Sequence, residues 1–193
     1  IREFVYNGKG FVGVGQPSYC HNQGRSFQLS DVLGVDQELG FSLSTNKYFE
    51  DVKEDHFITK DMKNFDFGES MKNVYSLSED TEILEFSNGE VHLSSHDYGK
   101  GRGVYIAGLP YSPENSRLLL RALLYAANKE AVENKTWTSN PLTELNGYKT
   151  KPMWSVVNNT NEPQQTTLNL HGKVIELNLD SSEIRWIKGD DDE

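Results

Sequence analysis

One cysteine and five histidines supply the residue types that could form a thiol–imidazole pair for nucleophilic catalysis. Cys20 lies in the segment GFVGVGQPSYCHNQGR, residues 10–25, a few residues after an apolar run that ends in glycines. Such strand ends often hold the nucleophile in α/β enzymes. A working cysteine also needs a general base, and normally a third group that orients that base.

None of the five histidines is placed by the sequence as that base. His21 is adjacent to the cysteine, and adjacent side chains rarely make the required hydrogen bond. His56 lies in a segment without clear periodicity that offers it no partner, and His171 lies in a hairpin turn. His92 and His96 would reach the thiol only through tertiary structure. The pattern therefore favours a structural cysteine.

His92 and His96 are four residues apart, a spacing that puts both side chains on one face of a regular strand. Two imidazoles could begin a metal site there, and Asp97 is near. No cysteine or acidic residue has the spacing that completes such a site. We interpret the pair as solvent-facing histidines on an edge strand, and we predict neither a metal nor a cofactor.

Gln16, Ser18 and Arg25 follow the carboxyl end of the expected strand at 11–15, where open α/β sheets bind ligands. They are the candidate substrate-binding residues, as contacts for a sugar or an anion, although hydrogen bonds that cap the loop would explain them equally well. The Gly13-Val14-Gly15 stretch lacks the third glycine of a dinucleotide-binding motif. No pair of acidic residues suggests glycosidase chemistry, so no catalytic residue is assigned.

Composition restricts the class of protein and its partners. A net charge of −10 and a pI near 5.0 argue against a nucleic-acid partner, which would need a basic face. No apolar run approaches the roughly 20 residues that span a bilayer, and no signal peptide is evident. A single cysteine fits a reducing compartment, so we expect a cytoplasmic location. The chain begins Ile1-Arg2 without methionine, and we interpret it as part of a longer polypeptide.

Several elements must position the candidate residues. A helix end at 1–6 precedes a strand at 11–15 that we expect to be covered on both faces, and a short helix ends at Gly34. Strand candidates are 74–77, 82–86 and 91–94, the last two joined by Asn88-Gly89. A strand at 104–107 leads into a long helix with Ser112 as N-cap, half of a βαβ unit.

The pattern changes after Lys135. Residues 136–150 are rich in Thr, Asn, Pro and Gly and are interpreted as a linker between an α/β domain at 1–135 and a second domain at 151–193. From Met153 on, apolar residues alternate with polar ones, which predicts a small antiparallel β module. The acidic tail at 190–193 is expected to be solvated.

Three long strings resemble one family of enzymes: NGKGFVGVGQPSYCHNQGRSFQLSDVLGVDQELGFSLSTNKYF (7–49), GRGVYIAGLPYSPENSRLLLRALLYAA (101–127) and WSVVNNTNEPQQTTLNLHGKVIELNLDSSEIRWI (154–187). They are similar to the central and C-terminal parts of the galactosyl-N-acetylhexosamine phosphorylases, that is, the lacto-N-biose and galacto-N-biose phosphorylases. The similarity covers nearly the whole chain.

The resemblance implies an N-terminal TIM barrel that holds the active site, an α/β domain of the class I glutamine-amidotransferase-like fold (flavodoxin-like and partly N-truncated here), and then β structure. The implied reaction is inverting phosphorolysis of a β-galactosyl disaccharide, which yields galactose 1-phosphate and the acceptor sugar. The chain would be a non-catalytic part of that glycosyltransferase, serving assembly and active-site support. Its implied partners are the barrel of the same polypeptide and, as a homo-oligomer, further copies.

The chain departs from a working amidotransferase at two positions. Gln16 stands directly after the strand, where the nucleophilic cysteine belongs, and Tyr111-Ser112-Pro113-Glu114 keeps Pro and Glu of a His-Pro-Glu motif without its histidine. We therefore expect a scaffold without its triad. Alternatives are an amidotransferase-like hydrolase that uses Cys20 and a trimerisation-type domain of a β-galactosidase. The acceptor sugar stays open between an N-acetylhexosamine and rhamnose.

Overall fold

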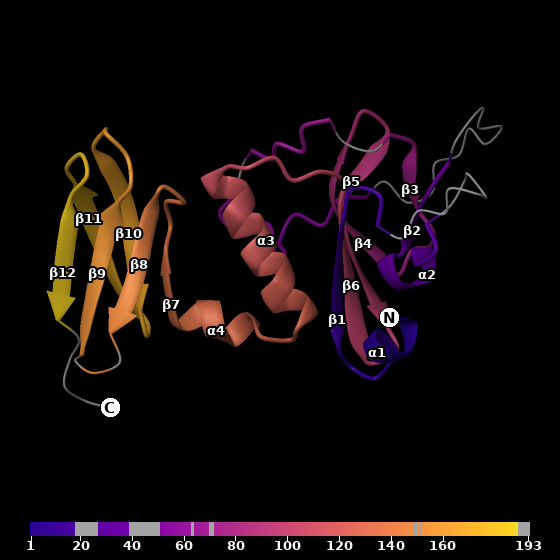
Figure 1. Ribbon diagram of the computed structural model, residues 1–193, viewed down its shortest axis with the longest axis horizontal. Coiled ribbons are helices and arrows are strands. Elements are labelled where there is room, and N and C mark those ends of the chain that lie inside the picture. The colour runs from indigo at the N-terminus through magenta and orange to yellow at the C-terminus, as the bar shows by residue number, and fades with distance from the viewer. Residues whose placement is uncertain are drawn as a thin grey trace. The chain divides into compact units, whose positions relative to one another are not determined.

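The computed structural model describes residues 1–17, 27–38, 51–62, 64–69, 72–148, 150 and 152–188, with the backbone alone at Asn134 (Figure 1). The chain divides into two compact units, residues 1–129 and 130–193. Among the described residues, no helix has the length and apolar character needed to cross a bilayer.

A four-stranded sheet forms the centre of the first unit, in the order β1-β6-β5-β4. Its strands are β1 (Gly10–Val14), β6 (Gly101–Ile106), β5 (Glu90–Tyr98) and β4 (Thr81–Ser87). β1 and β6 run parallel, whereas the β6–β5 and β5–β4 pairs are antiparallel. Asn88 and Gly89 both have positive φ, +54° and +77°, as a two-residue hairpin turn requires, which confirms the predicted hairpin.

Helices and a small second sheet cover this central sheet. The long helix α3 (Pro113–Ala126) packs against β1 and β6, and the hydroxyl of Ser112 accepts a hydrogen bond from the Asn115 backbone N–H, as predicted for the N-cap. The short helices are α1 (Arg2–Tyr6) and α2 (Ser30–Leu33), and α2 ends at Gly34 with φ of +70°. The second sheet pairs β2 (Val35–Gln37) with β3 (Val74–Ser76).

Two apolar cores lie on opposite faces of the central sheet, because side chains alternate along β6. Val104 and Ile106 join the core beneath α3, whereas Tyr105 and the following Ala107 join the core beneath α2. Gly103 lies at the centre of β6, where a Cβ would be 2.0 Å from the carbonyl oxygen of Val32. The absent side chain therefore lets α2 approach the sheet.

The prediction of an α/β, class I glutamine-amidotransferase-like (flavodoxin-like) fold is wrong. Strand residues outnumber helical residues more than twofold in the described part of the chain, and they form several small sheets. The β6–α3 unit that suggested the fold is present, but β6 is preceded by an antiparallel hairpin. In the part of the chain that the structure describes, the β1–β6 pair is the one parallel pairing between strands of a sheet.

The second unit begins with α4 (Glu130–Lys135) and continues as two three-stranded sheets, in the orders β11-β10-β7 and β12-β9-β8. All the pairings are antiparallel. The strands are β7 (Thr136–Thr138), β8 (Thr143–Tyr148), β9 (Met153–Asn158), β10 (Gln164–Leu170), β11 (Lys173–Leu179) and β12 (Ile184–Lys188). Residues 136–150, which we interpreted as a linker, thus carry β7 and β8.

Both sheets of the second unit contribute to one core. Leu168 and Leu179 come from the first sheet, Val156 comes from the second, and all three are at most 1% exposed. Trp154 packs against this core from β9. The opposite face of the β12-β9-β8 sheet carries the alternate residues of the same strands and does not contribute to this core.

Candidate functional site

The carboxyl edge of the parallel β1–β6 pair is the candidate functional site, because loops leave both strands there side by side. At the end of β1, the Gly15 N–H donates a 2.9 Å hydrogen bond to the Ile106 carbonyl, and Gly15 has φ of +72°. The Pro17 ring folds back so closely that a Cβ on Gly13 would lie 2.7 Å from it. This packing fixes the direction in which the chain leaves the strand.

The loop after β6 is held in place by backbone contacts and by a buried side chain. A Cβ on Gly108 would lie 2.0 Å from the Phe67 carbonyl oxygen, so the two backbones are in close contact. The side-chain amide of Asn115, on the first turn of α3, donates to the carbonyls of Pro110 (2.7 Å) and Asp66 (2.8 Å). Asn115 is 2% exposed. It ties the loop to the helix and to the segment around Asp66.

Tyr111 projects from this fixed loop with 97% of its surface exposed. Gln16 is exposed at the end of the neighbouring strand. The other two candidate binding residues, Ser18 and Arg25, lie outside the described residues, as do Cys20 and His21. The described part of the site therefore consists of the end of β1 with Gln16 and the anchored loop after β6 with Tyr111, at the same edge of the sheet.

The interpretation of His92 and His96 as solvent-facing edge histidines is wrong. β5 is an inner strand, and His92 is 6% exposed. The register of the hairpin shifts here, because Val91 pairs with Phe86 while Leu93 pairs with Glu85. His92 is the extra residue of this bulge and stacks on Phe67 in the core beneath α3.

The bulge also separates the two imidazoles. The His96 side chain lies against Gly34, on the face of the sheet that α2 covers. The two histidines therefore point to opposite faces, and the four-residue spacing does not produce a metal pair. Among the described residues there is no group of three His, Cys, Asp or Glu side chains that could hold a metal ion.

His92 is bound by acidic residues of the same hairpin. Its Nδ1 lies 2.8 Å from a carboxylate oxygen of Glu85, and its Nε2 lies 3.7 Å from one of Glu90. The hydrogen bond to Glu85 raises the pKa of His92 and outweighs burial, which lowers it. The buried imidazole is therefore stabilised in its protonated form as part of an ion pair.

His56 has a partner that the sequence did not indicate. Its Nε2 lies 3.5 Å from Glu82 on β4, and its ring meets the ring of Tyr125 on α3 edge-on at 4.6 Å. Lys53 and Ser95 bind the same carboxylate, and together they outweigh the effect of burial, so the pKa of Glu82 lies below its usual value. This cluster fastens the segment around residues 53–56 to the sheet and to α3.

Comparison with known proteins identifies the class to which this architecture belongs. The family description "Lacto-N-biose phosphorylase central domain" matches residues 1–131, and "Lacto-N-biose phosphorylase C-terminal domain" matches residues 137–187. The first match alone covers more than half of the chain. The chain belongs to the lacto-N-biose phosphorylase family, which confirms the resemblance inferred from the sequence.

Two curated relatives are similar to this chain over most of its length. The chain is 44% identical, over 96% of its length, to a 1,3-beta-galactosyl-N-acetylhexosamine phosphorylase of Lachnoclostridium phytofermentans. It is 30% identical, over 90% of its length, to a D-galactosyl-beta-1->4-L-rhamnose phosphorylase of the same organism. It spans 26% and 23% of these two relatives, so it corresponds to about a quarter of each.

Among solved structures, a beta-galactosidase from Bacillus circulans sp. alkalophilus aligns with 96% of this chain and 30% of its own. The identity is 16% and the TM-score 0.44.

Proposed function

We propose that this chain is the non-catalytic central and C-terminal part of an inverting β-galactoside phosphorylase. The complete protein would convert a galactosyl-β-1,3-N-acetylhexosamine and phosphate into galactose 1-phosphate and the free N-acetylhexosamine. The observation that carries this proposal is the match of two consecutive family domains along the chain, together with 44% identity to a phosphorylase of that specificity. The lower identity to the rhamnose enzyme favours the N-acetylhexosamine as acceptor.

The chain's own role in this proposal is to support a site that lies elsewhere in the polypeptide. Both buried histidines in the described part of the chain, His56 and His92, lie within ion-pair distance of carboxylates, which favours a structural role for them. The loop after β6 is suited to a supporting contact, since the Asn115 amide and the close approach of Gly108 to Phe67 hold it in place. Gln16, Ser18 and Arg25 remain the proposed contacts to sugar or phosphate, and Tyr111 joins them.

The catalytic TIM barrel of the same polypeptide would be the principal partner, and the complete protein would be a cytoplasmic homo-oligomer. An N-terminal barrel fits the length of the relatives, of which this chain spans about a quarter.

The experiment compares the 193-residue chain with the longer polypeptide that contains it. Each is incubated with galactosyl-β-1,3-N-acetylglucosamine, with and without inorganic phosphate, and galactose 1-phosphate is followed by ³¹P NMR. We expect product from the longer protein only, and only with phosphate. Release of free galactose in both conditions would instead identify a galactosidase.

A second arm tests the chain for chemistry of its own. The purified chain is incubated with glutamine and with simple amides before and after alkylation with iodoacetamide. We expect no turnover in either sample. Turnover that alkylation abolishes would assign a nucleophilic role to Cys20 and overturn the non-catalytic assignment.

A further inference from the structure

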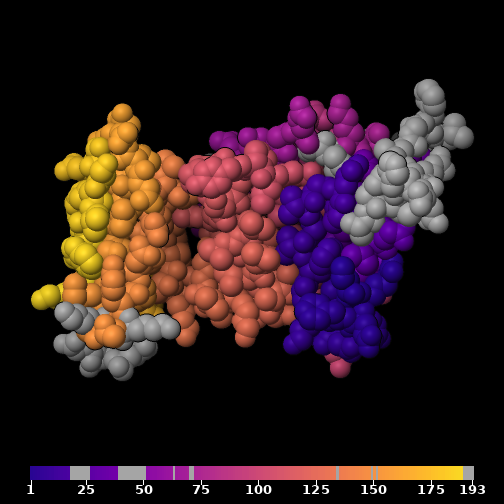
Figure 2. All heavy atoms as spheres, viewed as in Figure 1, coloured from indigo at the N-terminus to yellow at the C-terminus, as the bar shows by residue number. Residues whose placement is uncertain are grey.

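An aromatic face on the second unit has no role in the proposal above. Strand register places nine residues on the outer face of the β12-β9-β8 sheet, in three rows across the strands. The rows are Lys188, Met153 and Tyr148; Trp186, Ser155 and Asn146; and Ile184, Val157 and Glu144. The space-filling view shows β12, in yellow, at the surface of this unit (Figure 2).

Two aromatic rings dominate this face. The rings of Trp186 and Tyr148 approach within 5.4 Å between centroids, at an interplanar angle of 39°. They come from the two outer strands and meet above Ser155 on the middle strand, which explains why this serine is only 2% exposed. Trp186 nevertheless keeps 55% of its surface exposed, and Tyr148 keeps 45%.

Tyr148 is also held in place. The hydroxyl groups of Tyr148 and Ser155 lie 3.3 Å apart and form a hydrogen bond. The Cβ that Gly147 lacks would lie 2.5 Å from the Trp154 ring, so the backbone next to Tyr148 is packed directly onto a core side chain. Because Tyr148 is already ordered, the binding of a ligand to its ring costs little side-chain conformational entropy.

The size of the exposed surface argues against a stable protein interface. Aromatic side chains offer about 150–250 Å² each, so the half-exposed Trp186, Tyr148 and Ile184 together present roughly 300 Å². A specific protein–protein interface needs about 800 Å² from each partner, its polar rim included, so these three side chains alone would not form one. The apolar part of this face is therefore suited to a ligand of one or two sugar rings.

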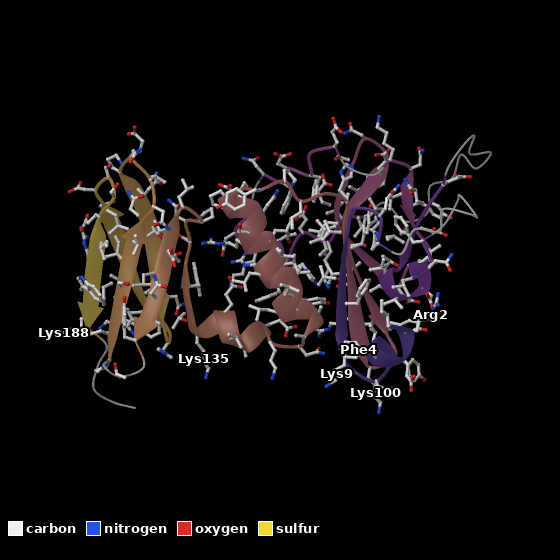
Figure 3. All side chains as sticks on the ribbon, in the orientation of Figure 1. Arg2, Phe4, Lys9, Lys100, Lys135 and Lys188 are labelled. Atoms are coloured by element: carbon white, nitrogen blue, oxygen red, sulfur yellow. The ribbon has the colours of Figure 1, made fainter. Side chains whose placement is uncertain are left out.

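The chemistry around the rings fits a sugar as well. A pyranose has one face of C–H bonds, whose partial positive charge is attracted to the electron-rich face of an aromatic ring. Its hydroxyl groups need hydrogen-bonding partners at the rim. Asn146 lies in the same row as Trp186, and Lys188 in the same row as Tyr148, at the end of β12 where Figure 3 labels it.

We propose that this aromatic face is a saccharide-binding platform, in which Trp186 stacks on a pyranose ring and Tyr148, Asn146 and Lys188 contact its hydroxyl groups. The choice of galactosyl-N-acetylglucosamine as the first ligand to test rests on the proposed function. The platform itself rests on the ring geometry and would bind sugar without any catalytic domain.

The test is an NMR titration of the ¹⁵N-labelled 193-residue chain with galactosyl-β-1,3-N-acetylglucosamine, in the absence of phosphate. We expect saturable shifts of the Trp186 indole N–H, with a Kd on the order of 1 mM. Trp186→Ala should weaken binding at least tenfold, whereas Trp186→Phe, which keeps a ring, should stay within about threefold. Tyr148→Phe should weaken binding by a few fold, because only the hydroxyl is lost.

Val174→Ala provides the matched control, since Val174 is an apolar residue of the same unit with 63% exposure but belongs to the other sheet. Its affinity should equal that of the unmodified chain. Absence of saturable binding, or equal binding by Trp186→Ala and the unmodified chain, would overturn the platform. Sedimentation equilibrium distinguishes the rival occupant: self-association that Trp186→Ala abolishes, without sugar binding, would assign the face to a second copy.

This outcome is separable from that of the proposed function. The titration contains no phosphate and no catalytic domain, so sugar binding would stand even if the longer polypeptide proved not to be a phosphorylase. Conversely, phosphorolysis by the longer polypeptide together with no binding here would refute the platform alone.

Discussion

Replacing Asn115 with alanine tests whether one buried amide fixes the loop at the candidate site. The side-chain amide makes two hydrogen bonds, to the carbonyls of Pro110 and Asp66, and the residue is 2% exposed. Its loss leaves both carbonyl oxygens without this donor, at about 1–3 kcal/mol for each buried group. Because water can enter a surface loop and bind part of the exposed carbonyl groups, we expect Asn115→Ala to lower the free energy of unfolding by about 2–4 kcal/mol in total.

The assay can assign this loss to one unit. All three tryptophans, Trp137, Trp154 and Trp186, lie in residues 130–193, so tryptophan fluorescence follows the second unit. The long helix α3 lies in the first unit, and circular dichroism at 222 nm reports it. In urea unfolding of Asn115→Ala, the dichroism transition should move to lower urea while the fluorescence transition stays in place.

Ser116→Ala is the matched control, one residue further along the same helix turn. Ser116 is exposed, and its hydroxyl donates to the Ser112 carbonyl at 2.8 Å, so its removal should cost less than about 1 kcal/mol. An Asn115→Ala protein as stable as Ser116→Ala would refute the inference that the amide fixes the loop.

Two further perturbations test the buried contacts of the first unit. Since Glu85 raises the pKa of His92, the pair stabilises the fold below the ordinary histidine pKa of 6.5 and loses this contribution as pH rises through the folded pKa. The free energy of unfolding of the unmodified chain should therefore exceed that of His92→Gln by more at pH 5.5 than at pH 9. Glu85→Gln should show the same smaller pH dependence of stability. A difference between the unmodified chain and His92→Gln that does not change with pH would contradict the ion pair. Gly103→Ala places a methyl group against the Val32 carbonyl and should lower the free energy of unfolding by about 3 kcal/mol, measured in urea. Gly15→Ala should lower it by only about 1 kcal/mol, because the added Cβ meets nothing within 4 Å and only the positive φ is strained. Equal costs would show that α2 does not approach the sheet as closely as described.

Local elements were predictable where the chain carries its own signal. Asn88-Gly89 predicted the hairpin between β4 and β5, and Ser112-Pro113 predicted the start of α3, because these residues determine backbone conformation within a few positions. The alternation after Met153 predicted the antiparallel strands of the second unit for the same reason.

Tertiary arrangement was less accessible. A strand followed by a buried helix is common to parallel and mixed sheets, so β6 and α3 could not reveal that β5 and β4 pair antiparallel. The error at His92 has a local cause, because a single bulge residue reverses the face of every later side chain on the strand. Glu82 and Glu85, acidic residues between the apolar positions of β4, are the sequence feature that could have indicated the carboxylate partners of His56 and His92.

The aromatic face was missed for a related reason. Trp186 lies in the segment whose alternation predicted a strand, but Tyr148 fell in residues interpreted as a linker. Two residues 38 positions apart become neighbours only when β8 and β12 flank the same middle strand, which the periodicity of each segment cannot indicate.

The proposal that this chain supports galactoside phosphorolysis without performing it is tested by measuring galactose 1-phosphate with ³¹P NMR. With galactosyl-β-1,3-N-acetylglucosamine and phosphate, we expect product from the longer polypeptide and none from the 193-residue chain. Product formed by the isolated chain, or none formed by the longer polypeptide while it releases free galactose, would contradict it.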